Sequence, residues 1–446
     1  MNDESKGTGK RILSRLGEPF TAILVANFTG SLGFSIVMPF LVFLVHQWGG
    51  NALIYGVMAA TYSAFQLVGS PLLGRWSDIW GRKRILVVSQ AGSMFSWIVA
   101  LAGFYVPMLT LYDVDSSLLG KFTLTLPLLL LFVARALDGL TGGNDAVANA
   151  YVADISPPDK QATNFGKLTA STNVSVALGP ALAGFLVATA LGYELPVIVA
   201  AAVCLVATIM IWFNLPDQEP TAETIHPPPA AGALTTCTGG QQLTIADRPA
   251  SAATLSVAEI LRLPRIPILL SASFLINLAF SIFNIALPVH AVQALSWSPG
   301  KMGAFFAVMS VVMVLVEGPG LRFASKVCND VVLIAMGGLV LGFGFLLLDS
   351  GSDMTMFTAA VLIAVGNGLM WPLVVALIAK RAGEHQGAVQ GVAGSTAAIA
   401  SIIGLLMGGL LYDSLHGWLF VISSTLTIVV MILAFCARRK VTSARG

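Results

Sequence analysis

The chain has 446 residues, of which 56% are hydrophobic and 10% charged, and its formal net charge is +2. A soluble globular domain carries about 25% charged residues, so this composition indicates a protein with many membrane-spanning segments. The net charge by itself says nothing about nucleic acid, and we expect no nucleic-acid partner for such a membrane protein. Four cysteines lie without metal or disulfide spacing, and no Ser/His/Asp arrangement is evident, so we expect no metal, no cofactor and no enzymatic activity.

Apolar residues gather in twelve segments long enough to cross a bilayer as helices, at about 1.5 Å per residue. The first is too long for the apolar region of a cleavable signal peptide, so we interpret it as a span. The sequence therefore predicts an all-α polytopic membrane protein. The predicted spans are residues 20–46, 52–74, 85–107, 122–151, 162–190, 194–214, 266–293, 301–322, 331–348, 355–379, 388–411 and 415–437.

The positions of the basic residues predict the orientation of these spans. The chain has 24 Lys and Arg, and with a cytoplasmic N-terminus only Lys121 and Lys301 fall outside, while Arg135 falls within a span. All the others would be cytoplasmic, as expected when positive charge remains on the inner side of a membrane. We therefore expect both termini to be cytoplasmic. We expect the membrane to be the inner membrane of a bacterium.

The chain divides into two halves with similar patterns. Residues 1–214 and 266–446 each hold six spans, and the polar, Pro- and Thr-rich segment 215–265 reads as a cytoplasmic linker with a short interfacial helix near 256–263. In span five Gly166 and Gly179 are thirteen residues apart, and so are Gly391 and Gly404 in span eleven. Two pseudo-symmetric halves predict a binding site between them.

A short charged stretch, residues 74–84, separates spans two and three. Its basic residues require water and would fix the topology of the chain. A topology signal alone needs positive charge, but not the ordered Gly74, Asp78, Gly81 and Arg82. We interpret these residues as a conformational latch, which Asp154 at the end of span four would join.

Span four carries ionisable residues inside the membrane. Arg135, Asp138, Gly142, Asp145 and Asn149 follow helical steps of three and four, so they share one face. A charge at the bilayer centre costs about 2.5–3.5 kcal/mol on insertion scales and should face a cavity or a partner. Arg135 and Asp138 can pair at i,i+3. Such a pair either locks helices together or belongs to a transport site.

Several motifs resemble those of the major facilitator superfamily. The stretch Gly74-x3-Asp78-x2-Gly81-Arg82-Lys83 resembles its loop between helices two and three, and Arg135-x3-Gly139 its drug–proton antiporter motif. Tyr151–Asp154 is similar to the tetracycline-efflux branch, and Gly179-Pro180-x3-Gly184 resembles the antiporter motif of span five. The resemblance implies a twelve-helix drug–proton antiporter. Tetracycline exporters carry an acid in span one where this chain has Gly30.

Other polar residues lie at similar depth in the spans. Each is either a hydrogen-bonding contact between helices or part of a central cavity with few formal charges, which would suit an apolar or amphiphilic substrate. We expect the substrate cavity to include Asn27, Ser31, Tyr62, Gln66, Asn277, Asn284, Asn367 and Trp371.

The sequence thus predicts a secondary active transporter that exports a small hydrophobic or amphiphilic compound by proton-coupled alternating access. Arg135, Asp138, Asp145 and Glu317 are the candidates for proton coupling, while Gly179, Pro180 and Gly184 would let the halves pack and rock. The expected partners are the substrate, protons and the bilayer, and the protein is expected to be a monomer. Two alternatives stay open: an exporter or flippase of sugars or lipids, and a lipid binder or sensor that transports nothing.

The predicted topology can be tested by labelling. A cysteine at Thr238 should react with impermeant thiol reagents only from the cytoplasmic side, and a cysteine at Ser116 only from outside. If both are labelled from the same side, the twelve-span arrangement is wrong.

Overall fold

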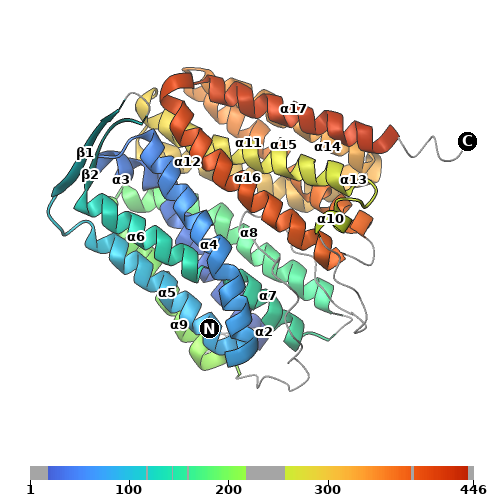
Figure 1. The fold of residues 1–446 in the computed structure, drawn as a ribbon, viewed down its shortest axis with the longest axis horizontal. Helices are drawn as coiled ribbons and strands as arrows, with labels where there is room; N and C mark the ends of the chain where they lie inside the picture. Colours follow the sequence, from blue (N-terminus) through green and yellow to red (C-terminus); the bar gives the residue numbers. More distant parts are fainter. Residues whose placement is uncertain are drawn as a thin grey trace, which may run out of the picture.

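The structure, a computed structural model, describes residues 19–116, 119–142, 144–157, 160–216, 257–382 and 386–439. These residues form a bundle of long helices with one β-hairpin (Figure 1). Ten of the described helices are long and apolar enough to cross a membrane. The predicted all-α membrane-spanning fold is confirmed.

The first group of elements, called the N-terminal bundle below, runs from α2 to α9. Its elements are α2 (Pro19–Val37), η1 (Met38–Phe40), α3 (Leu41–Gln47), α4 (Ala52–Trp80), α5 (Arg82–Ala102), β1 (Thr110–Ser116), β2 (Gly120–Thr125), α6 (Leu126–Thr141), α7 (Asn144–Ile155), α8 (Gln161–Val187) and α9 (Glu194–Asn214).

The second group, called the C-terminal bundle, runs from α10 to α17. Its elements are α10 (Val257–Ile260), α11 (Ile266–Gln293), α12 (Pro299–Leu315), η3 (Val316–Gly320), α13 (Leu321–Val327), α14 (Asp330–Leu346), η4 (Leu347–Asp349), α15 (Asp353–Ala382), α16 (Gln386–Leu415) and α17 (Trp418–Arg439). Most of the proposed linker lies outside the described residues.

Most predicted spans coincide with helices to within a few residues. The spans 194–214 and 266–293 match α9 and α11 at both ends, and α10 lies within the short helix expected near 256–263. The last span is present as α17, whose apolar part, Trp418–Ala434, is shorter than the other ten. With α17 and the divided fourth span, the count is consistent with twelve.

The charged stretch 74–84 is not the loop that the sequence indicated. Helix α4 continues through it to Trp80, and α5 begins at Arg82. Gly81 alone breaks the helix, with φ 91° and ψ 144°. A residue with a side chain adopts this positive φ only with strain, so a glycine is needed at this turn.

The prediction of one helix over 122–151 is wrong in two places. Residues up to Thr125 belong to β2, which pairs with β1 in an antiparallel hairpin. Helix α6 ends at Thr141, with Gly142 as its C-cap, and the described part of α7 begins at Asn144. The alternation in residues 122–125 was the available signal for the strand, because side chains of a strand point to opposite faces in turn.

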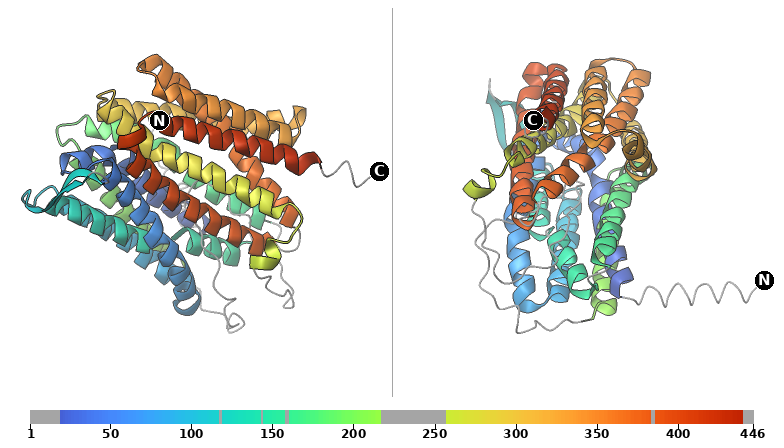
Figure 2. Two further views of the ribbon diagram at one scale, coloured as in Figure 1. Left: turned by 45° about the horizontal axis from the view of Figure 1, so that its top comes forward. Right: turned by 90° about the vertical axis from the view of Figure 1, so that its right-hand side faces the viewer.

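The β-hairpin lies at one of the two ends of the bundle, as Figures 1 and 2 show. The hairpin marks one, called the hairpin end, and it is joined to the turn before α4 because the amide of Thr123 donates to the Gly49 carbonyl over 2.8 Å. The opposite end, called the basic end, holds most of the described Lys and Arg residues: Arg75, Arg82, Lys83, Arg84, Lys160, Lys167, Arg262, Arg265, Arg322, Lys326, Lys380 and Arg381.

The hydrophobic core is continuous between the bundles in one part of the molecule and separate in another. One large cluster includes residues of both bundles, among them Trp97 and Phe283. A second cluster, around Leu73, Tyr151 and Phe165, consists of N-terminal residues near the basic end. The two bundles therefore share apolar packing mainly away from the basic end of the N-terminal bundle.

Glycines bring the two bundles into direct backbone contact at the hairpin end. Helix α8 packs on α12 and α4 packs on α16. A Cβ atom on Gly303 of α12 would lie 2.6 Å from the Cα atom of Gly184 on α8, and one on Gly56 of α4 would lie 2.9 Å from the Cα atom of Gly409 on α16. Only glycines permit helices to approach so closely.

The variant Gly303→Leu should force α8 and α12 apart, because the new side chain meets backbone rather than a movable side chain. We expect a longer distance between spin labels at Ala188 and Ser298, measured by electron–electron double resonance, and slower transport. Gly166→Leu, also on α8 and with open space around it, is the control. An unchanged distance in Gly303→Leu would show that this contact does not hold the bundles together.

Candidate functional site

A buried salt bridge lies in α6, where the sequence placed the charged face of span four. The Nη1 atom of Arg135 lies 3.0 Å from Oδ2 of Asp138, and the two side chains are 1% and 6% exposed. Ser93 on α5 also hydrogen-bonds to Asp138. The helical spacing i,i+3 brings the two groups together, and the surrounding helices exclude water from them.

Three aromatic rings from three helices surround the Arg135 guanidinium. Its carbon lies 4.4 Å from the ring centre of Tyr62, 5.4 Å from that of Phe34 and 5.7 Å from that of Trp97. The faces of such rings attract a cation, most strongly when water is excluded. Within the described residues the Nε and Nη2 atoms of Arg135 have no hydrogen-bond partner. The guanidinium therefore rests on ring faces and one carboxylate.

This arrangement can change its charge at one place only. A guanidinium stays protonated in proteins, whereas a carboxylate can take up or release a proton. Removing one partner of a buried pair typically costs about 3–5 kcal/mol, because the other charge stays buried alone. Proton uptake by Asp138 would thus require Arg135 to find another partner, and the two free N–H groups give it that capacity.

At the basic end, Arg82 holds three segments of the N-terminal bundle together. It forms a salt bridge with Asp78 at the end of α4, and its Nε donates to Oδ2 of Asp154 on α7 over 3.2 Å. Its Nη1 donates to the Ser77 hydroxyl over 2.7 Å. Four of the five latch candidates thus lie at this junction, while a side chain at Gly74 would meet open space.

The predicted packing glycines lie at two different interfaces. A Cβ atom on Gly179 would clash with Ser35 of α2, whereas Gly184 faces Gly303 across the junction of the bundles, and the Pro180 carbonyl also borders Gly303. In span eleven, Gly404 lies against Ser281 of α11 and Gly409 against α4. Both helices therefore use one glycine within their own bundle and one toward the other bundle.

The predicted cavity residues make separate contacts in this structure. Asn27 donates to Thr172 on α8 over 2.7 Å, and Asn367 donates to the sulfur of Met313 on α12 over 3.6 Å. Both are hydrogen bonds between helices, one of the two readings that the sequence left open. Gln66 donates to the Tyr62 hydroxyl over 3.2 Å, which links the pair to the aromatic surround of Arg135.

The other cavity candidates stay predictions. Asn277 donates to the Ser273 carbonyl on its own helix over 2.8 Å. Ser31, Asn284 and Trp371 are half-buried.

Two further candidates for proton coupling have different settings. Glu317 lies in η3, a short π-helical segment between α12 and α13, and its side chain borders Gly368 of α15. Such π-turns inside helices are often found at functional sites. Asp145 belongs to α7, and its side chain lies outside the described residues. Glu317 and the Arg135–Asp138 pair belong to different bundles.

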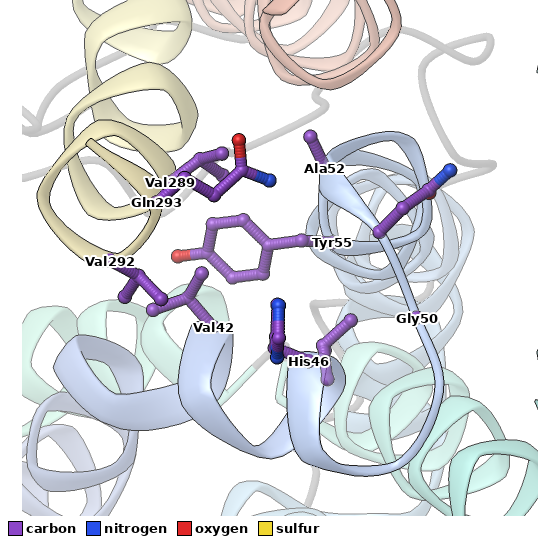
Figure 3. Close-up of a pocket in the computed structure, with 10 residues that line it drawn as sticks. Val42, His46, Gly50, Ala52, Tyr55, Val289, Val292 and Gln293 are labelled. Atoms are coloured by element: carbon purple, nitrogen blue, oxygen red, sulfur yellow. The ribbon is translucent and has the colours of Figure 1, made fainter. Parts of the chain in front are cut away.

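Two structural features were not evident from the sequence. Within the N-terminal bundle, Gln90 of α5 fills the space that a side chain at Gly30 of α2 would need. At the hairpin end, a small hollow lies between the bundles, and Figure 3 shows the Tyr55 ring extending from α4 toward Val292 and Gln293 of α11, with His46 beside it. Tyr55 is 5% exposed, so its side chain is buried between the bundles at this end.

Two bundles of membrane-spanning helices, joined at one end and carrying a buried ion pair, define a transporter-type membrane protein. A model of the Major Facilitator Superfamily matches residues 23–327 and 269–445. The chain belongs to this family.

Its relatives lie in the tetracycline-efflux-like branch. The tetracycline resistance protein of class E from Escherichia coli is 26% identical, over 92% of this chain and 93% of its own length. Multidrug resistance protein 2 of Bacillus subtilis (strain 168) is 22% identical, over 91% and 94%. The solved structure of the human organic anion transporter MFSD10 (TETRAN) matches with a TM-score of 0.59 and 17% identity, covering 93% of this chain and 98% of that one, which shows the shared fold.

The junction at Arg82 can be tested with Asp78→Asn. Because Asp78 is 54% exposed and Arg82 keeps Asp154 as a partner, the stability loss should be small, about 0–1 kcal/mol. We expect slower transport with normal membrane insertion, measured in vesicles. Asp115→Asn, which breaks the exposed Lys121 pair in the hairpin, is the control. If Asp78→Asn transports at the wild-type rate, the charged stretch only fixes the topology of the chain.

Proposed function

We propose that this chain exports a small hydrophobic or amphiphilic compound in exchange for protons, by alternating access of a site between its two bundles. Its relatives carry the names of tetracycline and multidrug resistance proteins, which supports a drug as the substrate class. Tetracycline exporters carry an acid at the position of Gly30, and here the Gln90 side chain occupies the space that a side chain at this position would need. We therefore favour a substrate other than tetracycline.

The observation that carries the proposal is the buried pair of Arg135 and Asp138. A proton-driven transporter needs a group inside the membrane whose protonation changes during the cycle. Asp138 is such a group, and Arg135 provides the charge that favours its ionised form. Breaking and remaking this pair as the helices move would bind a proton in one state and release it in the other.

The contacts between the bundles support the alternating movement. The hairpin end is closed by glycine contacts and Tyr55, whereas the N-terminal bundle keeps a separate core near the basic end. Where backbone lies against backbone through glycines, few side chains have to move when the junction opens. We propose that the basic end is cytoplasmic, that the protein works as a monomer in the bacterial inner membrane, and that Arg82 steadies the cytoplasmic ends of its bundle.

The variant Asp138→Asn should abolish proton-coupled efflux and keep substrate binding, because the amide fills the same space but cannot release a proton. Arg135→Ala should damage both activities, since it leaves a buried carboxylate unpaired and a void between three rings, at a cost of about 3–5 kcal/mol in stability. The measurement is drug-induced proton release from everted vesicles, with ethidium as the probe, beside equilibrium binding of ethidium.

Asp413→Asn, an exposed acid at the hairpin end, serves as the matched control and should couple normally. Undiminished coupling in Asp138→Asn would move the proton site to Asp145 or Glu317. If none of the three acids is needed, proton antiport is the wrong mechanism.

A further inference from the structure

A second hollow lies inside the C-terminal bundle at the basic end, away from the junction of the bundles. Four helices enclose it: α11, α14, α15 and α17, which pack on one another (Figure 1). Its volume is about 100 Å³. Apart from two arginines its lining is entirely apolar, and includes Leu269, Ala272, Ile334, Val374, Leu377 and Leu433.

The two arginines belong to different helices. Arg265 precedes the first turn of α11, where its φ is 73°, and Arg381 lies in the last turn of α15. Within the described residues neither forms a salt bridge, and no acidic residue lines the hollow. The acidic residue that directly adjoins a lining residue in the sequence is Asp330, next to Val331, and it does not itself line the hollow. Among the described residues, the hollow therefore combines two guanidinium groups that have no acidic partner with an apolar interior.

This combination matches one kind of molecule, an amphiphile with an anionic head. Guanidinium groups bind phosphate oxygens through paired N–H donors, and apolar cavities of this order of size hold small hydrocarbon groups. Basic pockets between membrane helices are known to bind anionic lipid headgroups. The end of the bundle that holds Arg265 and Arg381 is also where a leaflet's headgroups would lie.

We propose that this hollow binds an anionic phospholipid of the leaflet at the basic end, with the phosphate on Arg265 and Arg381 and the first part of one acyl chain in the cavity. The lipid would connect α11, α14, α15 and α17, all of one bundle. It therefore would not cross the path between the bundles, and its binding is independent of the transport activity proposed above.

The test uses the full chain, purified and delipidated in detergent, with native mass spectrometry of bound dioleoyl phosphatidylglycerol and dioleoyl phosphatidylcholine. Arg265→Gln and Arg381→Gln should each weaken phosphatidylglycerol binding about five-fold and leave phosphatidylcholine unchanged. Ala272→Leu, which narrows the cavity and keeps both arginines, should weaken the binding of both lipids. Arg381→Lys should retain most of the preference, since it keeps the charge. Thermal unfolding in phosphatidylcholine confirms that each variant is folded.

Arg262→Gln and Lys380→Gln are the matched controls, because both are exposed basic residues at the same end that do not line the hollow. If these controls weaken phosphatidylglycerol binding as much as Arg265→Gln and Arg381→Gln do, general surface charge binds the lipid and the proposal fails. It also fails if Ala272→Leu changes nothing, or if sodium oleate binds more tightly than phosphatidylglycerol with the same dependence on Arg265 and Arg381.

Discussion

The salt bridge between Arg135 and Asp138 constrains the N-terminal bundle more than any other described contact. Neither charge could stay buried alone, so each must be matched inside the membrane. The carboxylate has Arg135 and Ser93, and the guanidinium has Phe34, Tyr62 and Trp97 on three other helices. Helices α2, α4 and α5 are thus held around α6 by the need to accommodate one cation.

The two bundles meet by a different physical principle. Their contacts at the hairpin end are glycines of α8 against α12 and of α4 against α16, where backbone lies on backbone. Dispersion between closely packed helices contributes to holding such a junction. Side chains take part as well, since Tyr55 of α4 borders the same hollow as Val292 and Gln293 of α11.

The basic end differs between the bundles. In the N-terminal bundle Arg82 is matched by Asp78, Asp154 and Ser77, so its charge holds helices together. In the C-terminal bundle Arg265 and Arg381 border an apolar hollow, and neither has an acidic partner among the described residues. The two bundles therefore differ in how their basic residues at this end are paired.

The sequence by itself determined the features that depend on short separations along the chain. Apolar length gave the spans at 194–214 and 266–293, the i,i+3 step gave the pair of Arg135 and Asp138, and the thirteen-residue spacing picked out Gly179 and Gly404. The hairpin and the break at Gly142 were missed because a strongly apolar run hides a short alternating strand and a local break in a helix. Only the tertiary structure decided that Gly184 meets Gly303, that Gln90 covers Gly30, and that Arg265 and Arg381 share one hollow. Those contacts join residues far apart in the chain, and packing between helices, which no local pattern records, sets which faces meet.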